Sequence, residues 1–279
     1  MSYKTIFTAV SDTELLGPVL DKAVTLTQGF EAHLDVLAVG VDRTQTGYYY
    51  AGANAMVLQE SLNRASDDAK ALSAAARKQL EKTDCRWAIE DSVAQIADVG
   101  RHVAARARYS DLVVLPRPYG KGRGIEMEPI IEGAMFEGQT PVLVLPDEGT
   151  VTVPPRRILM AWNESPEALR AMRAAIPLMQ EADVVHVVVI DPPSHGADRS
   201  DPGGRVAQYL SRHGMRVEID VLSKSLPRVS DVLSRHVVDM DADMIVMGAY
   251  GHSRFREAIL GGATRNMLEK ASVPVFMAH

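Results

Sequence analysis

A glycine-rich stretch in the second half of the sequence has the spacing of a phosphate-binding loop. Gly248 and Gly251 are followed, after nine residues, by Gly261 and then Gly262. A glycine turn that leads into a helix exposes backbone N–H groups beside the positive end of the helix dipole, and this arrangement favours phosphate. The alternative interpretation is that these glycines only make turns.

The residues around these glycines strengthen the hypothesis of a binding site. His252 and Arg254 add positive charge between the glycines, and Thr264 adds a hydroxyl after them. The apolar run 244–247 predicts a strand that ends at the first glycine, and residues 263–271 predict a helix after the last. Ligands of open α/β sheets bind at the carboxyl ends of the strands, which is where this loop would lie.

Other patterns that carry chemistry are missing. A Rossmann dehydrogenase needs G-x-G-x-x-G after its first strand, and the corresponding segments here are AVSDTELLG and AWNESPEAL. The P-loop signature is absent as well, and no Ser/His/Asp or Cys/His grouping has the spacing of an activated nucleophile. The single cysteine, Cys85, excludes an internal disulfide and a multi-cysteine metal site. We therefore predict no catalytic residue and no metal site.

The elements that must position the glycine loop occur twice along the chain. Each half opens with an apolar strand pattern that a basic residue precedes, and each half closes on a strand that a proline precedes. The interval from the aspartate of a later strand to that proline is 30 residues in the first half, from Asp111 to Pro141, and 31 in the second, from Asp243 to Pro274. Intervals this similar indicate a duplication.

Within each half, short β-rich runs alternate with longer helical patterns, which predicts a parallel sheet joined by right-handed crossovers. We expect an α/β fold of two tandem doubly wound domains, each with a five-stranded parallel sheet flanked by helices. The domains would span residues 1–147 and 155–279, with a Pro/Gly/Thr-containing linker at 148–154. Residues 85–90 and 215–222 are the expected third strands.

Composition limits the class of protein and of partner. Among 279 residues, 30 are Lys or Arg and 36 are Asp or Glu, so the formal net charge is −6. Nothing in this balance favours nucleic acid or an acidic membrane surface. No apolar run reaches the roughly 18 residues that a membrane span requires, and the first residues indicate a strand and not a signal peptide. We expect a cytoplasmic protein.

The stretch MGAYGHSRFREAILGGATRNMLEKASVPVFM resembles the C-terminal signature of the universal stress protein family, G-x-x-G-x9-G-[S/T]. The first strand, the strand that an aspartate precedes and the final Pro-Val strand fit the same family. The resemblance covers the whole second half and, more weakly, the first. It implies a nucleotide-binding α/β fold with strand order 3-2-1-4-5 and, in the ATP-binding branch of the family, a bound ATP.

The resemblance also implies where the nucleotide would lie. Residues 161–163 after the first strand would approach the adenosine, Val189 would meet the adenine through its backbone, and the glycines would hold the ribose and phosphates. With the charged and hydroxyl residues of the loop, the expected nucleotide-binding set is Ala161, Trp162, Asn163, Val189, Met247, Gly248, Gly251, His252, Arg254, Gly261, Gly262, Ala263 and Thr264.

Two positions depart from the family pattern. Asn163 stands where the family usually has aspartate, and Gly262 stands where it usually has serine or threonine. Asparagine can hydrogen-bond a ribose hydroxyl, but it cannot hold a metal ion as a carboxylate can. We expect ATP as the ligand and leave an accompanying Mg²⁺ open.

The first half has lost these features. Alignment of the halves on their final prolines places Glu128 opposite Gly261 and Pro129 opposite Gly262. A carboxylate repels phosphate, and proline has no N–H group to offer. The PYGKGRG run at 118–124 is rich in glycine and positive charge, but it has no matched helix entry after it, so a loop is favoured over a second site. We expect a degenerate nucleotide site with a structural or regulatory role.

The expected function is that of an ATP-binding stress-response sensor or regulator that is not an enzyme, with slow ATP hydrolysis left open. One alternative is a nucleotide-free scaffold of the same family that binds a protein partner. Another is an ATP-dependent ligase or pyrophosphatase, which would need a Ser/Gly-rich turn where this sequence has AWNES. The resemblance further implies that strands 141–145 and 274–277 pair within the chain, so that the two domains mimic a dimer. Dimerisation of whole chains stays open.

Overall fold

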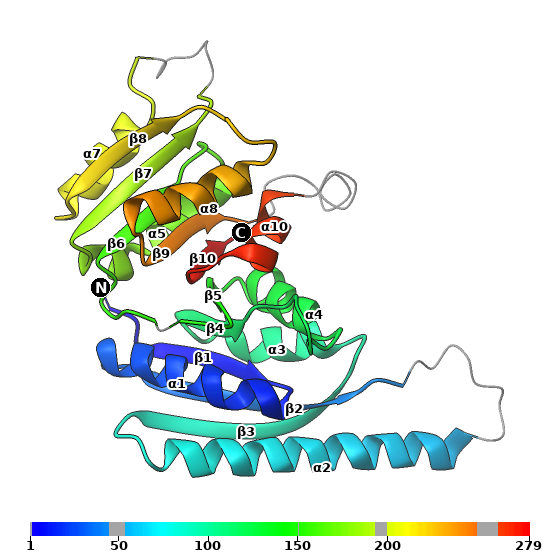
Figure 1. Cartoon of the computed structure of the whole chain (residues 1–279). Helices are drawn as coiled ribbons and strands as arrows, with labels where there is room; N and C mark the ends of the chain where they lie inside the picture. The colour runs from blue at the N-terminus through cyan, green and yellow to red at the C-terminus, as the bar shows by residue number, and fades with distance from the viewer. Residues whose placement is uncertain (1, 45–53, 150, 193–199, 250–261) are drawn as a thin grey trace. The chain divides into compact units, whose positions relative to one another are not determined.

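The polypeptide forms two compact units, Tyr3–Thr140 (the first unit) and Pro141–His279 (the second unit). Each unit is an α/β structure with a mostly parallel sheet, which Figure 1 shows in a computed structural model. The structure describes residues 2–44, 54–149, 151–192, 200–249 and 262–279.

The sheet of the first unit has the strand order β3-β2-β1-β4, and its strands are parallel. On this sheet α1 and α2 contact each other and β2, whereas α3, α4 and the π-helical turn η2 pack against one another. The elements are β1 (Thr5–Val10), α1 (Thr13–Gly29), β2 (His33–Asp42), α2 (Asn54–Leu80), β3 (Arg86–Gln95), α3 (Val99–Ala107), β4 (Leu112–Pro116), α4 (Met127–Glu132) and η2 (Gly133–Glu137).

The sheet of the second unit has the order β8-β7-β6-β9-β10-β5. The strands from β8 to β10 are parallel, in the expected order of third, second, first, fourth and fifth strand of the second half. The elements are β5 (Val142–Leu145), β6 (Arg157–Ala161), α5 (Pro166–Ala174), α6 (Ile176–Gln180), β7 (Val184–Ile190), α7 (Gly204–Arg212), β8 (Val217–Leu222), α8 (Val229–Met240), β9 (Met244–Gly248), α10 (Ala263–Lys270) and β10 (Val275–Ala278).

The two aspartates that the repeat shares have the same structural role in both units. The backbone N–H groups of Thr5 and of the residue before it donate to Asp111 Oδ2 at 2.9 and 2.7 Å. The N–H groups of Arg157 and of the residue before it donate to Asp243 Oδ2 at 2.8 and 2.7 Å. A carboxylate that accepts two backbone N–H groups satisfies donors at the start of the strand that would otherwise need other hydrogen-bond partners. Each aspartate therefore joins the start of its unit's fourth strand to the start of its first.

The pairing of β5 with β10 was expected from the two final strands of the halves. The two strands are antiparallel, with Val144 beside Val275 and Val142 beside Met277. All residues of β5 and β10 are buried. The pairing satisfies backbone groups that an unpaired edge strand would expose.

The third strand of the first unit is longer than its sequence pattern predicts. β3 continues to Gln95, whereas the expected strand ended at residue 90. Its register follows β2 throughout, from His33 beside Arg86 to Asp42 beside Gln95. Because β3 is an edge strand with mostly exposed side chains, hydrogen bonding to β2 and not an apolar pattern determines where it ends.

Candidate functional site

The second unit changes direction between β6 and β9, which are neighbours in the sheet. From β6 the chain continues to β7 and β8 on one side, and from β9 it continues to β10 on the other. The register places Ala161 beside Val188 and Met160 beside Val246, so the carboxyl ends of β6, β7 and β9 lie together. In open α/β sheets the crevice at such a switch point is where ligands bind.

Several predicted site residues meet at this edge of the sheet. Ala161 ends β6 and Gly248 ends β9, and both are half-buried. Val189 and Met247 are the next-to-last residues of β7 and β9, and both are buried. The structure thus brings these four predicted residues to one end of one sheet. Gly251, His252, Arg254 and Gly261 lie outside the described residues.

The turn after β6 is occupied by the start of helix α5. Asn163 Oδ1 accepts a hydrogen bond from the N–H of Ser165 at 3.2 Å, and Ser165 Oγ accepts one from the N–H of Ala168 at 3.1 Å. Ser165 is therefore the N-cap of α5, with Pro166 in the first helical position. Trp162 is half-buried and Asn163 is exposed beside it. The Asn163 amide is partly engaged in this turn, and it has no carboxylate charge for a metal ion.

Gly248 has a packing role that does not depend on any ligand. A Cβ atom at this position would lie 2.5 Å from the backbone N of Ala168 and 2.7 Å from the carbonyl carbon of Glu167. Both atoms belong to the first turn of α5, so only glycine lets β9 approach that turn. The glycine therefore positions the start of α5 against the end of β9 at the crevice.

The start of α10 is held by a hydrogen-bond network that sequence patterns did not reveal. The backbone N–H and the Nδ2 group of Asn266 both donate to the carbonyl of Gly262, at 3.2 and 3.1 Å. Arg228, which precedes α8, donates from Nη1 to Asn266 Oδ1 at 3.0 Å. A guanidinium group and the N-terminus of a helix thus lie close together, and both favour an anion.

The N-cap of α10 differs from those of α1 and α5, the helices that follow the first strand of each repeat. Asp12 caps α1 and Ser165 caps α5 through their side chains, whereas the N-cap of α10 is Gly262, which has no side chain. Ala263 and Thr264 follow in the first turn, half-buried and buried respectively. The first turn of α10 therefore carries no competing N-cap oxygen at the place where the sequence predicted a phosphate.

A buried polar cluster lies elsewhere in the second unit, between β7, β8 and α8. Asp220 Oδ2 lies 3.1 Å from Nδ1 of His186 and 2.7 Å from Nε2 of His236. One carboxylate oxygen thus connects a core strand, an edge strand and a helix. The described residues contain no group of three or more His, Cys, Asp or Glu side chains placed to hold a metal ion.

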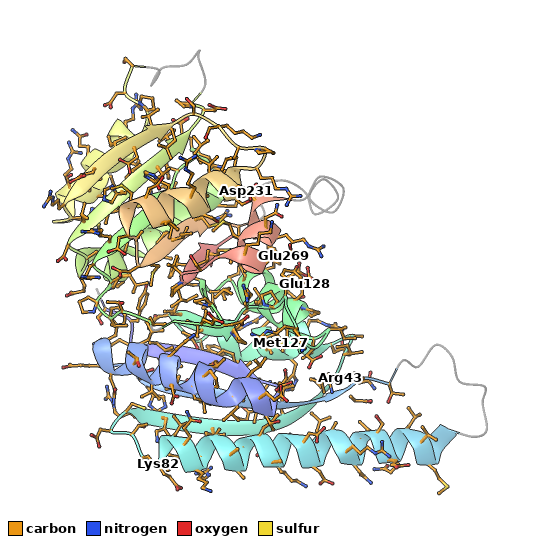
Figure 2. The ribbon with its side chains drawn as sticks, in the orientation of Figure 1. Arg43, Lys82, Met127, Glu128, Asp231 and Glu269 are labelled. Carbon is orange, nitrogen blue, oxygen red and sulfur yellow. The ribbon has the colours of Figure 1, made fainter. Side chains whose placement is uncertain are left out.

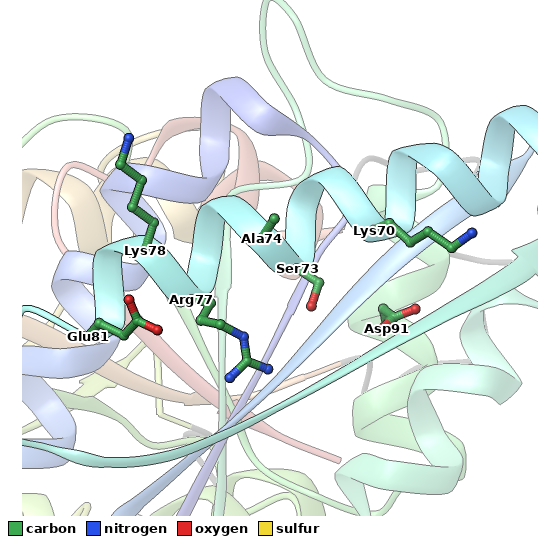
Figure 3. A pocket seen from close by; sticks show the side chains of 7 residues that line it. All are labelled: Lys70, Ser73, Ala74, Arg77, Lys78, Glu81 and Asp91. Atoms are coloured by element: carbon green, nitrogen blue, oxygen red, sulfur yellow. The ribbon is translucent and has the colours of Figure 1, made fainter.

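The first unit contains a hollow between α2 and β3, with a volume of about 310 Å³. In Figure 3, Ser73 and Arg77 point towards β3, whereas Lys78 points away from it. Arg77 also lies over the ring of Trp87, 5.5 Å from its centroid. The lining, which includes Glu81 and Asp91, mixes positive and negative charge. It therefore lacks the single sign of charge that a phosphate site needs.

In the first half, the residues aligned with the second-half glycines are Glu128 and Pro129, and one expectation about this segment needs correction. Glu128 is half-buried and accepts a hydrogen bond from the hydroxyl of Tyr119 at 2.6 Å, and Pro129 lies inside α4. The expectation that no matched helix entry follows the glycine run at 118–124 was wrong, because α4 begins at Met127, three residues after Gly124. This helix has only six residues before the π-helical turn η2, so its apolar pattern was too short to recognise.

None of the helices in the described part of the chain combines the length and the apolar character that crossing a bilayer requires. The fold defines the class: a doubly wound α/β protein with a topological switch point at the carboxyl ends of β6 and β9.

Comparison with known proteins shows a family likeness in the second half of the chain. Residues 155–279 match the model of the universal stress protein family. Universal stress protein Slr1230 of Synechocystis sp. is 28% identical over 159 residues, a match that covers 54% of this chain and 50% of that protein. The chain thus spans about half the length of this curated relative. The second half of the chain thus matches the universal stress protein family, as its glycine signature indicated.

Solved structures show the same fold across the whole chain. A universal stress protein from Archaeoglobus fulgidus DSM 4304 superposes with a TM-score of 0.73 at 16% identity, covering 98% of this chain and 95% of that chain. A functionally unknown protein, PA1789 from Pseudomonas aeruginosa PAO1, superposes with a TM-score of 0.59 at 14% identity, covering 99% of this chain and 92% of that chain. At these identities the likeness concerns the fold.

Proposed function

We propose that this chain binds one ATP (or ADP) per molecule at the switch-point crevice of its second unit and acts as a stress-response sensor or regulator. ATP hydrolysis is slow or absent in this proposal, and the protein works in the cytoplasm. The residues that hold the nucleotide are the expected set from Ala161 to Thr264, with the loop glycines at its centre.

The observation that carries the proposal is the convergence of three features at one edge of the sheet. The carboxyl ends of β6 and β9 meet at the switch point, and Gly248 ends β9. Helix α10 starts at a glycine N-cap without a side-chain oxygen. The guanidinium of Arg228 donates a hydrogen bond to the side chain of Asn266 in the same helix α10. Backbone N–H groups, a helix N-terminus and a cation are the parts from which phosphate sites are built.

The residues that are present fit the nucleotide better than they fit a metal ion. The amide of Asn163 can hydrogen-bond a ribose hydroxyl, but it already accepts the N–H of Ser165, and it has no charge. We therefore propose that the protein binds the phosphates through N–H groups and cations, and that any Mg²⁺ is carried by the nucleotide and not by protein carboxylates.

Isothermal titration of the full chain with ATP tests the proposal. We expect a stoichiometry of one, and we expect Gly261→Asp to abolish binding, because it introduces the carboxylate that the first half has at the aligned position Glu128. Gly214→Asp is the matched control in the same unit. A Cβ at Gly214 meets nothing within 4 Å, but its φ of +85° strains any side chain, so circular dichroism must first show that this control variant is folded.

Two results would contradict the proposal. One is the absence of binding of any adenine nucleotide at millimolar concentration, which would favour the nucleotide-free scaffold. The other is an equal loss of binding in the control Gly214→Asp and in Gly261→Asp. Mass spectrometry of small molecules released from the purified chain gives an independent answer, and phosphate release above background would favour an enzyme.

A further inference from the structure

The first unit has a switch point equivalent to that of the second. β1 and β4 are neighbours in its sheet, with Ile6 beside Leu112. Ser11 follows β1 directly, six residues after Thr5, just as Asn163 lies six residues after Arg157 in the second unit. Thr5 and Arg157 are the equivalent residues that donate to the shared aspartates. Ser11 therefore stands at the position of the first unit that corresponds to Asn163.

A buried carboxylate lies at this place. Glu126 directly precedes α4, and its side chain is only 1% exposed. Its Oε1 atom forms an ion pair with Nη2 of Arg43, which follows β2, and lies 3.5 Å from Oγ of Ser11. Figure 2 labels Arg43 beyond β2 and Met127 at the start of α4. The side chain of Glu126 thus joins the segments that follow β1 and β2 to the entry of α4.

The space around this carboxylate is closed. A Cβ atom on Gly124 would lie 2.4 Å from each oxygen of Glu126, so the loop passes as near as a glycine allows. Glu126 Oε2 is buried and has no hydrogen-bond partner in the described part of the chain. A buried carboxylate with one unpaired oxygen lowers stability, so packing alone does not explain this residue type.

Arg43 depends on Glu126 for its charge partner. The neighbouring acid, Asp42, is buried, and its Oδ1 accepts hydrogen bonds from Oγ of Ser61 at 2.6 Å and from the N–H of Thr44 at 2.9 Å. Burial favours the neutral acid, but these hydrogen bonds outweigh it and lower the pKa of Asp42. Asp42 is thus committed to its own turn, and Arg43 points to Glu126.

We propose that Glu126 is a built-in anion: in the first unit it takes the place of a phosphate ligand on Arg43 and Ser11, and it keeps this crevice closed to phosphate-bearing molecules. At the position that the repeat aligns with Glu126, the second half has an apolar residue. Counting 15 residues back from the final proline gives Glu126 from Pro141 and Ile259 from Pro274. The proposal concerns the first unit and holds whether or not the second unit binds a nucleotide.

Titration of the full chain with inorganic phosphate at constant ionic strength tests this proposal. All variants carry Gly261→Asp, which removes the proposed site of the second unit, so that any binding belongs to the first. We expect Glu126→Ala to bind phosphate at least about tenfold tighter than the parent, because it frees both the cation and the space beside it. Glu126→Gln should gain less, because the amide still fills the space.

Glu128→Ala is the matched control, since Glu128 lies two residues further along the chain, in the first turn of α4, and pairs with Tyr119 instead. It should bind phosphate no better than the parent. Adding Arg43→Gln to Glu126→Ala should abolish the gain, because it removes the cation. If Glu126→Ala does not fold, Glu126→Ser, which restores a polar group in the same space, replaces it.

Three results would overturn the proposal. They are equal phosphate affinity in the Glu126 and Glu128 variants, phosphate binding by the parent that is as tight as that of Glu126→Ala, and a gain that persists without Arg43. None of these depends on ATP binding to the wild-type chain. A failure of the proposed nucleotide site would appear only in the ATP titration of the wild type.

Discussion

The environment of His102 disfavours its charged form. Burial lowers the pKa of His102, and the nearby positive charge of Arg106 lowers it further, although Glu90 acts in the opposite direction. Nε2 of His102 lies 2.6 Å from Oγ of Ser92, so the imidazole links α3 to the edge strand β3. Arg106 in turn donates to Glu90 Oε2 at 3.1 Å and lowers the pKa of that carboxyl.

This arrangement predicts a pH dependence of stability. The folded pKa of His102 is lower than the unfolded value of about 6.5, so the folded state binds fewer protons near that pH. The contribution to stability is complete above pH 6.5 or so and is lost as the pH falls through the folded pKa. The midpoint of urea unfolding of the wild type should therefore fall more than that of His102→Gln between about pH 7.5 and pH 5. Parallel curves for the two proteins would refute this.

At the scale of elements, the contact between α2 and β2 depends on Gly40. A Cβ atom there would lie 1.7 Å from the carbonyl oxygen of Ala65, which is a backbone atom of α2 and cannot move alone. α2 lies over β2 and β3 and can approach β2 closely because Gly40 has no side chain. This single glycine therefore determines how closely α2 approaches the sheet.

We expect Gly40→Ala to destabilise the protein by about 3 kcal/mol or more, because helix and strand must separate. Gly17 offers a control within α1, where a Cβ atom would meet nothing closer than Gln79 Oε1 at 4.0 Å. Gly17→Ala should change stability by less than about 1 kcal/mol, because the helix preference of alanine is opposed by the restriction that Pro18 places on the residue before it. Equilibrium unfolding in urea measures both changes, and losses of equal size in the two variants would contradict the close approach.

At the scale of the whole molecule, the pairing of β5 with β10 joins the two repeats. β5 is the last strand of the first repeat, yet it belongs to the compact unit Pro141–His279 and is hydrogen-bonded to β10. The segment between the repeats starts with the exposed residues 147–149. That the tandem chain mimics a dimer of single domains, with one nucleotide site, stays a prediction.

A protease site inserted after Gly149 tests this inference, because Gly149 is exposed and a side chain there meets nothing within 4 Å. After cleavage the two fragments should elute together in size-exclusion chromatography, since β5 stays paired with β10. Leu143→Asp, which places a charge on a fully buried position of β5, should release the fragments. Separation of the cleaved fragments that keep Leu143 would disprove the dimer-like arrangement.

Much of the fold followed from local patterns. Alternating apolar strands and helical stretches predicted the α/β class, and the repeat aligned Asp111 with Asp243, which accept equivalent backbone N–H groups in the two units. The end of β3 did not follow, because an edge strand is defined by its hydrogen bonds to β2. The helix after residue 124 was missed because it is one and a half turns long before it widens into η2.

The sequence by itself determined the tandem repeat, the glycine positions and the likeness of the second half to universal stress proteins, since each of these is a pattern of neighbouring residues or of fixed spacing. Only the tertiary structure decided which side chains meet. Arg43 and Glu126 are 83 residues apart, and Arg228 and Asn266 are 38 apart. Alignment of the repeats therefore pointed to Glu128, whereas packing placed Glu126 in the crevice. Such pairs depend on how helices and loops pack over the sheet, and no local pattern encodes that choice of partner.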